Sequence, residues 1–476
     1  MQKEIKFNNR EWIKRTISEF KASPVRKKMF EAEKYYNHEH AILKRKREVI
    51  GGNKELIEVK HLPNNKIVDN QFRKMVKQKN NYLLGKPVSF QTDDTDHAKA
   101  LQYVFGRQFM RVLKNVGRNG LTAGIGYIHP YYNERGEFSF KRFDPTEFVP
   151  VWADRDHTEL KAGIRFFDDT VVTDGREKKI ERIEVYTTQG VFYWVDVDGE
   201  IKPSDVPHLP HFIATDGELT GAFNWSRVPI IPFKCNAGEE SLLSTSVKSL
   251  QDGINSILSN FQNTMEEDTR NTLMVLVNFD GANLGEFRQN LAEYGAVKVR
   301  NSQQHPSGDV KTLTVEVNAE NYKAIIQVFK KALIENAMGY DAKDDRMSGN
   351  ANQLNIMSMY NDIDMDTNET ELEYQASFEM LLWFVHHHLV NSGKGNWVDE
   401  DVTVIFNRDM LMNETEIIDG ITKSVGVLSD ETLVAQHPYV NDPVKEMERI
   451  ENEENERLKS AENLNFGGVI GGASDG

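Results

Sequence analysis

Residues 79–90 read KNNYLLGKPVSF, and this stretch predicts a helix that ends at a corner and continues as a strand. Apolar side chains recur every three or four residues on its N-terminal side, which predicts a helix over residues 67–84. Gly85 predicts the end of that helix, because glycine takes a left-handed terminal conformation without steric cost. Pro87 favours an extended exit, and the alternating residues after it predict a strand.

The composition indicates a folded protein with more than one core. The chain has 476 residues, of which 39% are hydrophobic and 28% are charged, whereas single domains usually hold about 50–200 residues. Its one cysteine, Cys235, excludes an intramolecular disulfide and a zinc site made of cysteines. The sequence has no run of eighteen apolar residues and no apolar signal core at its start, so we expect a cytoplasmic protein without a membrane span.

The charge distribution indicates which kinds of partner the chain can bind. The net charge of −15 argues against tight, static binding of nucleic acid, which needs a basic excess. It is compatible with DNA that passes without being held, and equally with a protein that meets no nucleic acid. Basic clusters at 26–28 and 44–47 and an acidic run at 446–456 are interpreted as solvated helix faces. Salt bridges between copies of the chain are the alternative.

The periodicity changes twice along the chain and predicts an α+β fold. N-terminal helices precede a region of period two from residue 121, which predicts an antiparallel β region rather than a parallel nucleotide-binding sheet. From residue 241 the apolar residues follow a period of 3.5, which keeps one stripe against a neighbouring helix. The stripe comprises Leu243, Val247, Leu250, Ile254, Ile257 and Phe261.

The remaining segments are an insert, a returning helix and a long helix. A short α/β insert over 272–318 separates the striped helix from a second helix over 319–338. A charged, glycine-bounded stretch at 339–352 predicts an exposed loop. A helix from residue 353 to about residue 389 follows it, which is far longer than the usual three or four turns. Further helices are predicted over 413–459.

The search for catalytic chemistry yields one weak candidate. Asp362, Asp364 and Asp366 alternate within a helix and raise the alternative of a metal-dependent nuclease, although a solvated or interfacial acidic face is the favoured interpretation. No P-loop is present, and the histidines at 386–388 point in directions about 100° apart on a helix. We therefore expect no enzymatic activity, no cofactor and no metal.

The opening stretch contains NYLLGKPV, which resembles the signature of the SPP1-type portal family of tailed bacteriophages. The structural corner motif comprises Asn81, Tyr82, Gly85 and Pro87. Residues 250–260 are similar to the family's descending stem helix, and residues 143–151 are similar to its wing strands. The order of elements matches the family from about residue 10 to about residue 460.

The resemblance implies a portal-type subunit with a helical crown and stem, a β-rich wing and a small α/β clip. The implied parts are the N-terminal helices and wing (1–240), descending stem helix (241–271), clip (272–318), ascending stem helix (319–338), tunnel loop (339–352), long wing helix and strand pair (353–412), crown helices (413–465) and flexible tail (466–476). The tunnel-loop residues implied to face DNA are Asp341, Lys343, Asp344, Asp345, Arg346 and Met347.

The resemblance also implies a function. Portal subunits form a ring of about twelve at one capsid vertex, through which double-stranded DNA is packaged and ejected. The implied partners are the large subunit of terminase, scaffolding and major capsid proteins and a head-completion adaptor. The implied location is the virion, after assembly in the host cytoplasm. A DNA-processing nuclease and a monomeric interaction module are the alternatives.

Overall fold

The computed structural model of the chain describes residues 7–50, 56–60, 62–173, 176–216, 219–268, 273–277, 309–313, 319–341, 353–408, 414–440 and 443–466. The chain forms two compact units. The first unit comprises Met1–Gly339 and Asp366–Arg408, and the second comprises Tyr340–Met365 and Asp409–Gly476.

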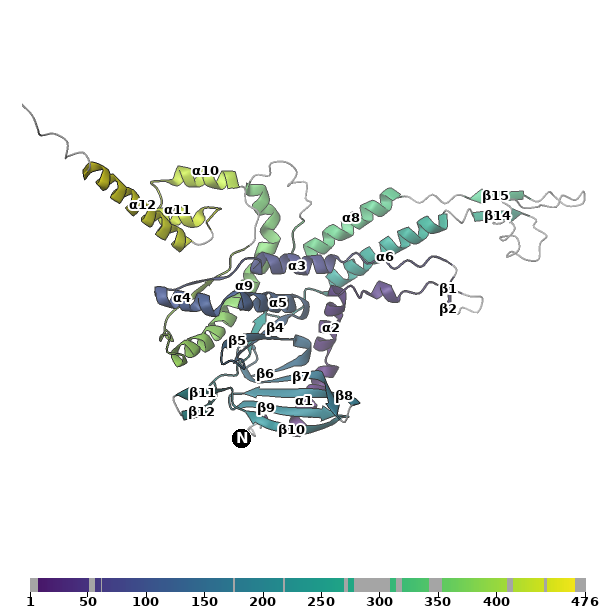
Figure 1. The fold of residues 1–476 in the computed structure, drawn as a ribbon. Helices are drawn as coiled ribbons and strands as arrows, with labels where there is room; N and C mark the ends of the chain where they lie inside the picture. Colours follow the sequence, from purple (N-terminus) through teal and green to yellow (C-terminus); the bar gives the residue numbers. More distant parts are fainter. Residues whose placement is uncertain are drawn as a thin grey trace, which may run out of the picture. The chain divides into compact units, whose positions relative to one another are not determined.

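Helices form most of the N-terminal part of the first unit (Figure 1). Ser23 separates the first two helices, because its hydroxyl accepts the Arg26 N–H as an N-cap and Pro24 occupies the first helical position. The elements are α1 (Arg10–Ala22), α2 (Pro24–Tyr36), the 3₁₀ helix η1 (Ala41–Lys44), β1 (Glu48–Ile50), β2 (Leu56–Glu58), α3 (Gln71–Leu84), β3 (Ser89–Gln91), α4 (Thr95–Val104) and α5 (Arg107–Ala123).

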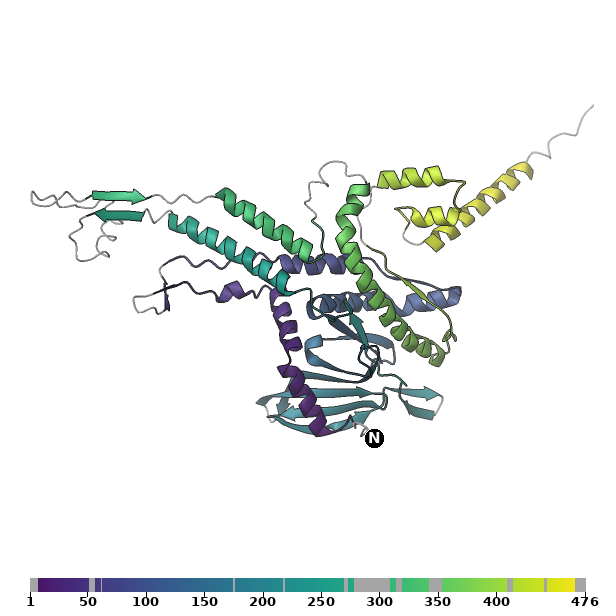
Figure 2. The same ribbon diagram turned by 180° about the vertical axis from the view of Figure 1, so that it is seen from behind.

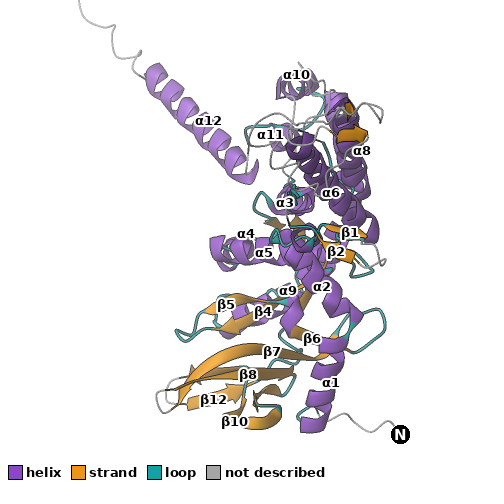
Figure 3. Cartoon of the chain, turned by 90° about the vertical axis from the view of Figure 1, so that its right-hand side faces the viewer, coloured by secondary structure: helices purple, strands orange, loops and turns teal. Residues whose placement is uncertain are grey.

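An antiparallel β region follows, as the sequence predicts. Its strands are β4 (Ile125–Tyr132), β5 (Phe138–Phe143), β6 (Phe148–Trp152), β7 (Leu160–Thr173), β8 (Arg176–Thr187), β9 (Gly190–Val197), β10 (Glu200–Leu209), β11 (Phe212–Asp216), β12 (Leu219–Phe223) and β13 (Ile231–Lys234), with the 3₁₀ turn η2 (Pro145–Glu147) before β6. One sheet has the order β10-β9-β8-β7-β6, another has the order β13-β4-β5, and β11 pairs with β12. Figure 3 shows α1 lying against the larger sheet, where Ile13 and Ile17 pack on Ile164, Phe166 and Ile183.

Two long helices and a strand pair complete the first unit. Figures 1 and 2 show α6 (Thr245–Asp268) and α8 (Ala319–Asn336) side by side, and β14 (Leu273–Val277) pairs with β15 (Asp309–Leu313). Helix α9 (Gln353–Asn391) agrees closely with the long helix expected from the sequence. Its C-terminal part packs Phe378 against Phe233 of β13, with ring centroids 5.7 Å apart. Strand β16 (Thr403–Ile405) pairs with β3.

The second unit contains the N-terminal part of α9 and three further helices. These helices are α10 (Glu414–Ser424), α11 (Asp430–Gln436) and α12 (Pro443–Phe466). Within this unit the ring of Tyr360 on α9 packs on Tyr340, with centroids 4.5 Å apart. Ser429 caps α11 by accepting the Thr432 N–H.

The predicted corner differs from the structure in two ways. Helix α3 begins at Gln71 with Asn70 as its N-cap, so residues 67–70 are not helical. Gly85 has φ −73° and ψ −35°, which is right-handed, so the predicted left-handed cap is wrong. The chain leaves the helix because Pro87 restricts the residue before it to an extended conformation, and because Ser89–Gln91 then pair with β16.

Two breaks shape the helices that precede the β region. Phe105 and Gly106 separate α4 from α5. Gly124 ends α5 with φ 85°, and a Cβ atom at this position would lie 1.9 Å from the carbonyl oxygen of Glu239. Only glycine fits this turn, because it tolerates both the positive φ and the close approach of the 239 backbone.

Candidate functional site

Helix α6 carries a row of buried polar side chains beside its apolar stripe. The row comprises Gln251, Asn255, Ser259 and Asn263, which lie four residues apart and expose between 0% and 5% of their surface. Side chains four apart lie on one helical face. Buried amides and hydroxyls are costly unless they form hydrogen bonds, so their partners identify what this face binds.

The partner of this row is the backbone of residues 65–72. Asn65, Ile67, Asp69 and Phe72 each donate their N–H to one member of the row, namely Asn263, Ser259, Asn255 and Gln251, over 2.7, 2.9, 2.9 and 2.9 Å. Gln251 also donates to the Asp69 carbonyl over 2.7 Å. We call this arrangement the polar ladder.

The ladder works because two spacings agree. Two residues of extended chain advance about 6.6 Å, and four residues of α-helix advance about 6.0 Å. Alternate N–H groups at 65, 67 and 69 therefore meet successive turns of α6 in reverse order. The bond to Phe72 satisfies one of the free N–H groups at the start of α3. The ladder thus links helix α6 directly to the corner helix α3.

His40 extends the ladder toward α2. Its Nδ1 lies 2.8 Å from Asn255 Nδ2, and its Nε2 lies 3.0 Å from the carbonyl oxygen of Tyr35. Because Asn255 Nδ2 can only donate, the His40 proton resides on Nε2 and the ring is neutral. Burial lowers the pKa of His40 accordingly. The hydroxyl of Tyr35 donates to Asp252 over 2.7 Å and thereby joins α2 to α6.

Two ion pairs tie the same region to α8 and α9. Lys330 on α8 lies 2.6 Å from Asp69, so the residue held by α6 also contacts α8. Lys79 on α3 lies 2.6 Å from Asp366 on α9, and only 4% of the Lys79 side chain is exposed. Since a buried ammonium needs a counter-charge, Asp366 fixes α9 against α3.

A small cavity adjoins the Lys79–Asp366 pair. It has a volume of about 20 Å³ and is lined by residues of α3, α5 and α9 together with Cys235, which is room for about one water molecule. Burial raises the pKa of the Cys235 thiol to about 12. The thiol is therefore protonated at neutral pH and is no nucleophile.

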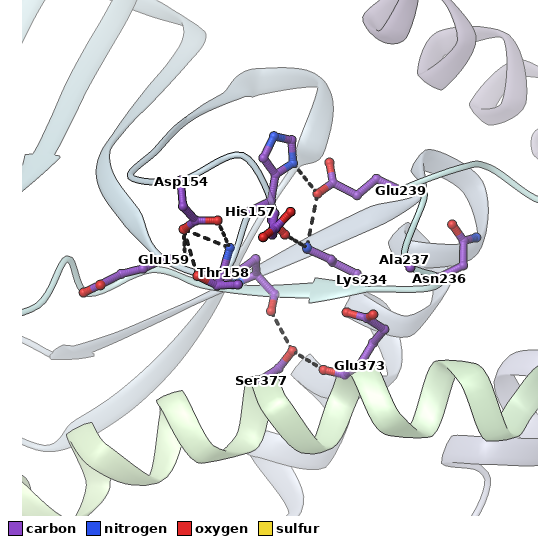
Figure 4. A network of polar contacts seen from close by, with 12 residues as sticks. Asp154, His157, Thr158, Glu159, Lys234, Asn236, Ala237, Glu239, Glu373 and Ser377 are labelled. Atoms are coloured by element: carbon purple, nitrogen blue, oxygen red, sulfur yellow. Dashed lines mark hydrogen bonds and ion pairs between the residues drawn. The ribbon is translucent and has the colours of Figure 1, made fainter.

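A second polar network surrounds Glu239, just before α6 (Figure 4). Its carboxylate lies 2.7 Å from His157 Nδ1 and 3.5 Å from Lys234 Nζ. His157 and Glu239 have φ values of 57° and 53°, which non-glycine residues rarely adopt. In the same view Ser377 Oγ on α9 lies 2.7 Å from the Pro232 carbonyl oxygen. These contacts join the β6–β7 loop, strand β13 and α9 to the segment that precedes α6.

The apolar stripe of α6 faces α8 of the same chain. Val247 and Ile254 are buried in one cluster with Leu333 of α8, and the ring of Phe261 contacts that of Tyr322, whose centroid is 4.9 Å away. Leu243 and Leu250 pack against this cluster, and Ile257 is half-buried. The stripe and the polar ladder therefore occupy adjacent faces of α6.

The other residues singled out from the sequence are only partly described. Asp341 is half-buried at the end of the segment after α8. Lys343, Asp344, Asp345, Arg346 and Met347 lie outside the described residues. In the corner motif, Tyr82 is buried in α3, whereas Asn81, Gly85 and Pro87 are exposed. Asn407 donates to the Pro87 carbonyl over 2.7 Å and fixes the corner against the strand β16 region.

The candidate chemical groups do not converge. Within the described ranges, no three His, Cys, Asp or Glu side chains are arranged to hold a metal ion. His386 faces His97 of α4, with their Nε2 atoms 3.1 Å apart, and burial lowers the pKa of His386 to about 4. His388 instead lies 3.0 Å from the Tyr132 hydroxyl. None of the helices in the described ranges combines the length and the apolar run that crossing a bilayer requires.

Sequence reasoning missed the polar ladder. The signal was present, because Gln251, Asn255, Ser259 and Asn263 recur every fourth residue and none of them is charged. On a solvated face we would expect charged residues at such positions. The partner could not be identified from the pattern, since it is the backbone of a segment almost 200 residues earlier.

Two curated portal proteins and one solved structure are similar to this chain. The portal protein of Bacillus phage SPP1 is 29% identical over 467 residues, which cover 97% of this chain and 90% of that protein. The portal protein of Clostridium phage phiCD119 is 26% identical over 439 residues, covering 90% of this chain and 93% of that protein. A chain in the solved neck of an empty GTA particle, computed with C6 symmetry, has 12% identity and a TM-score of 0.40, with coverage of 75% and 87%.

The family comparison spans both units of the chain. A family described as "Phage portal protein, SPP1 Gp6-like" matches residues 24–460, from the start of α2 into α12. The match includes the corner at residues 79–90, the polar ladder and helices α6 and α8. The chain therefore belongs to the SPP1 Gp6-like family of phage portal proteins.

Proposed function

We propose that this chain is the subunit of a ring of about twelve copies at one vertex of a phage capsid. Double-stranded DNA passes through the ring during packaging and ejection. Portal proteins are structural components of virions, and the family assembles as a ring in phage capsids. The observation that carries the proposal is the family match over residues 24–460.

The paired helices support a stem role for α6 and α8. Their shared apolar cluster, the polar ladder and the Lys330–Asp69 pair fix the two helices as one element. Side chains that remain exposed on this element include Val328 at 67% and Ile325 at 47% on α8. We assign these two residues to contacts between neighbouring subunits, since isolated apolar side chains gain about 25 cal/mol per Å² on burial.

The remaining parts receive the roles that the family implies. Residues 272–318 are proposed as the clip, which docks the large subunit of terminase and later the head-completion adaptor. Residues 339–352, with Asp341, Lys343, Asp344, Asp345, Arg346 and Met347, are proposed to face the DNA. Charged side chains of both signs suit transient contact with the phosphate backbone and no reading of bases. Scaffolding and major capsid proteins are the proposed partners during assembly in the host cytoplasm.

Native mass spectrometry and negative-stain imaging of the purified protein test the ring. We expect particles near twelve times the subunit mass of 54.6 kDa, with a central hole. The double variant Ile325→Asp/Val328→Asp should shift the mass toward monomer, because it introduces charge into the proposed contact. Lys323→Asp/Lys331→Asp, on exposed positions of the same helix, is the control for added charge. A monomer at every concentration of the wild type would contradict the proposal.

The nuclease alternative makes a separate prediction. Asp366 is held by Lys79 and is not grouped with two other potential metal ligands in the described part of the chain. Incubation with DNA and Mg²⁺ should therefore leave the DNA intact. Cleavage that disappears in Asp362→Asn or Asp366→Asn would support the enzyme instead.

A further inference from the structure

Helices α3 and α5 carry a concentration of positive charge that contrasts with the acidic chain. The whole protein has a net charge of −15, yet neither helix contains an Asp or Glu. Between them they contain eight cationic side chains: Arg73, Lys74, Lys77 and Lys79 on α3 and Arg107, Arg111, Lys114 and Arg118 on α5. Charge of one sign on two adjoining helices indicates an anionic partner.

The cations of α5 form a narrow stripe. At 100° per residue, Arg107, Arg111, Lys114 and Arg118 fall within about 60° of one another around the helix. The opposite face holds Phe109, Leu113 and Val116, which are buried in the core. The stripe therefore points away from the core, and Arg107, Arg111 and Lys114 are exposed.

The cations of α3 lie beside that stripe. The two helices run antiparallel, because Val76 in the first half of α3 packs in one cluster with Leu121, and Leu84 at its end packs in another with Leu113. Figures 1 and 2 show them side by side.

Tyr36 of α2 lies where the start of the α3 row of cations meets the end of the α5 row. The guanidinium groups of Arg73 and Arg118 lie 4.9 and 5.3 Å from its ring centroid. From Tyr36 the rows run along both helices, with Lys74 and Lys77 exposed on α3. We call Lys74, Lys77, Arg107, Arg111 and Lys114 the basic face.

No counter-charge within the described part of the chain neutralises the basic face. Lys79 is paired with Asp366, and Arg118 lies 3.9 Å from Glu33. By contrast, none of the five side chains of the basic face forms an ion pair with another described residue. The face lacks large exposed apolar side chains on either helix as well. Stable protein interfaces are depleted in Lys and need apolar or aromatic anchors, so the chemistry favours a polyanion over a protein partner.

We propose that the basic face binds the phosphate backbone of double-stranded DNA without sequence preference, at a site separate from residues 339–352. Cations spaced three or four residues apart along a helix recur every 4.5–6 Å or so, which allows flexible Lys and Arg side chains to reach successive phosphates. No base-reading geometry is required. The choice of duplex DNA as the anion rests on the proposed function, and the phosphate chemistry rests on the charges alone.

Fluorescence anisotropy with a labelled 30-base-pair duplex over 50–200 mM NaCl tests the proposal. Each phosphate contact makes the slope of log K against log salt more negative by about 0.9. Arg107→Gln/Arg111→Gln/Lys114→Gln should therefore make the slope less steep by about 2.7 and weaken binding about tenfold or more. Lys27→Gln/Arg135→Gln/Arg155→Gln removes the same charge from exposed positions elsewhere in the first unit and should change neither. The charge-preserving variant Arg107→Lys/Arg111→Lys/Lys114→Arg should bind as the wild type does, which separates lost charge from misfolding.

The mass of each sample, measured in parallel, separates this inference from the proposed function. If wild type and the glutamine triple variant both form rings and bind DNA with the same affinity, the proposal that the basic face binds DNA is wrong, and the proposed ring is unaffected. Monomers that bind duplex DNA with the expected slope would overturn the ring alone. Single-stranded DNA and duplex RNA serve as competitors. If the triple variant loses subunit assembly while DNA binding is unchanged, the face contacts an acidic protein surface instead and the proposal is wrong.

Discussion

Asn255 on α6 and Asp69 before α3 are held together through the backbone: the Asn255 side-chain oxygen accepts the Asp69 N–H over 2.9 Å. The Asp69 side chain in turn reaches Lys330 on α8 at 2.6 Å. A single residue of an irregular segment is therefore bound by both α6 and α8. Any movement of α6 relative to α3 must break these bonds, so the ladder is a rigid joint between α6 and α3.

Replacing Asn255 by leucine should destabilise this joint. The variant leaves the Asp69 N–H, one N–H of the Gln251 amide and His40 Nδ1 without a partner in a buried site, which we expect to cost about 3 kcal/mol of unfolding free energy. Urea denaturation measures the loss, and hydrogen exchange should be faster at the amides of Ile67 and Asp69. Thr245→Leu, at an exposed position of the same helix, should stay within about 0.5 kcal/mol of the wild type. Equal losses in both variants would contradict a specific role for the ladder.

Lys79→Met should destabilise the contact between α3 and α9. Removing the ammonium leaves Asp366 beside an apolar wall, and we expect a loss of about 2 kcal/mol, reduced because 31% of the Asp366 side chain is exposed. The double variant Lys79→Met/Asp366→Leu should recover much of the loss, since it removes both charges. Thermal unfolding monitored by circular dichroism is the measurement. A double variant that loses as much stability as the two single variants together would argue against a direct pair.

Gly117→Ala should push α3 and α5 apart. A Cβ atom at Gly117 would lie 2.3 Å from Asn80 Oδ1 and 2.6 Å from Leu84 Cδ1. Such overpacking costs about 1–3 kcal/mol, and the gain in helix propensity offsets up to about 1 kcal/mol of that cost. Gly420→Ala on α10 is the control, because a Cβ atom added to Gly420 would meet nothing within 4 Å. That control should gain up to about 1 kcal/mol from helix propensity. Equal stability of G117A and wild type in urea denaturation would show that the helices separate without cost.

Acid should weaken the contact between α4 and α9 through His386. Its pKa is lowered to about 4 by burial, with His97 and His387 adding repulsion, while the unfolded chain titrates near 6.5. As pH falls from 6.5 toward 4, the unfolded chain binds a proton that the folded chain does not, so stability is lost in this window.

The measurement is the melting temperature at pH 7 and pH 5. His386→Gln should show a smaller drop than the wild type, although Asp94 and Glu400 near His97 oppose part of the effect. His387→Gln removes only the smallest contribution to the lowered pKa of His386 and should retain most of the drop. If the wild type melts at the same temperature at both pH values, the neutral histidine pair does not control stability.

The helices and strands were largely predictable because their periodicity is local. The period is visible in the sequence of α9, of the antiparallel β region and of α6 and α8, and the described elements follow it. The family resemblance likewise depended on a contiguous string around Tyr82 and Gly85. The prediction of a left-handed conformation at Gly85 is wrong, because Pro87 and the pairing of β3 with β16 determine how the chain leaves α3.

By itself the sequence determined the family, the helix periods and the apolar stripe from Leu243 to Phe261. Only the tertiary structure decided what the neighbouring face of α6 binds, and that residues 67–70 are not helical. The reason is physical: the N–H groups of this segment are satisfied by side chains about 190 residues later. No local pattern encodes a hydrogen bond between a backbone and a distant helix face, whereas helical periodicity is contained in each turn.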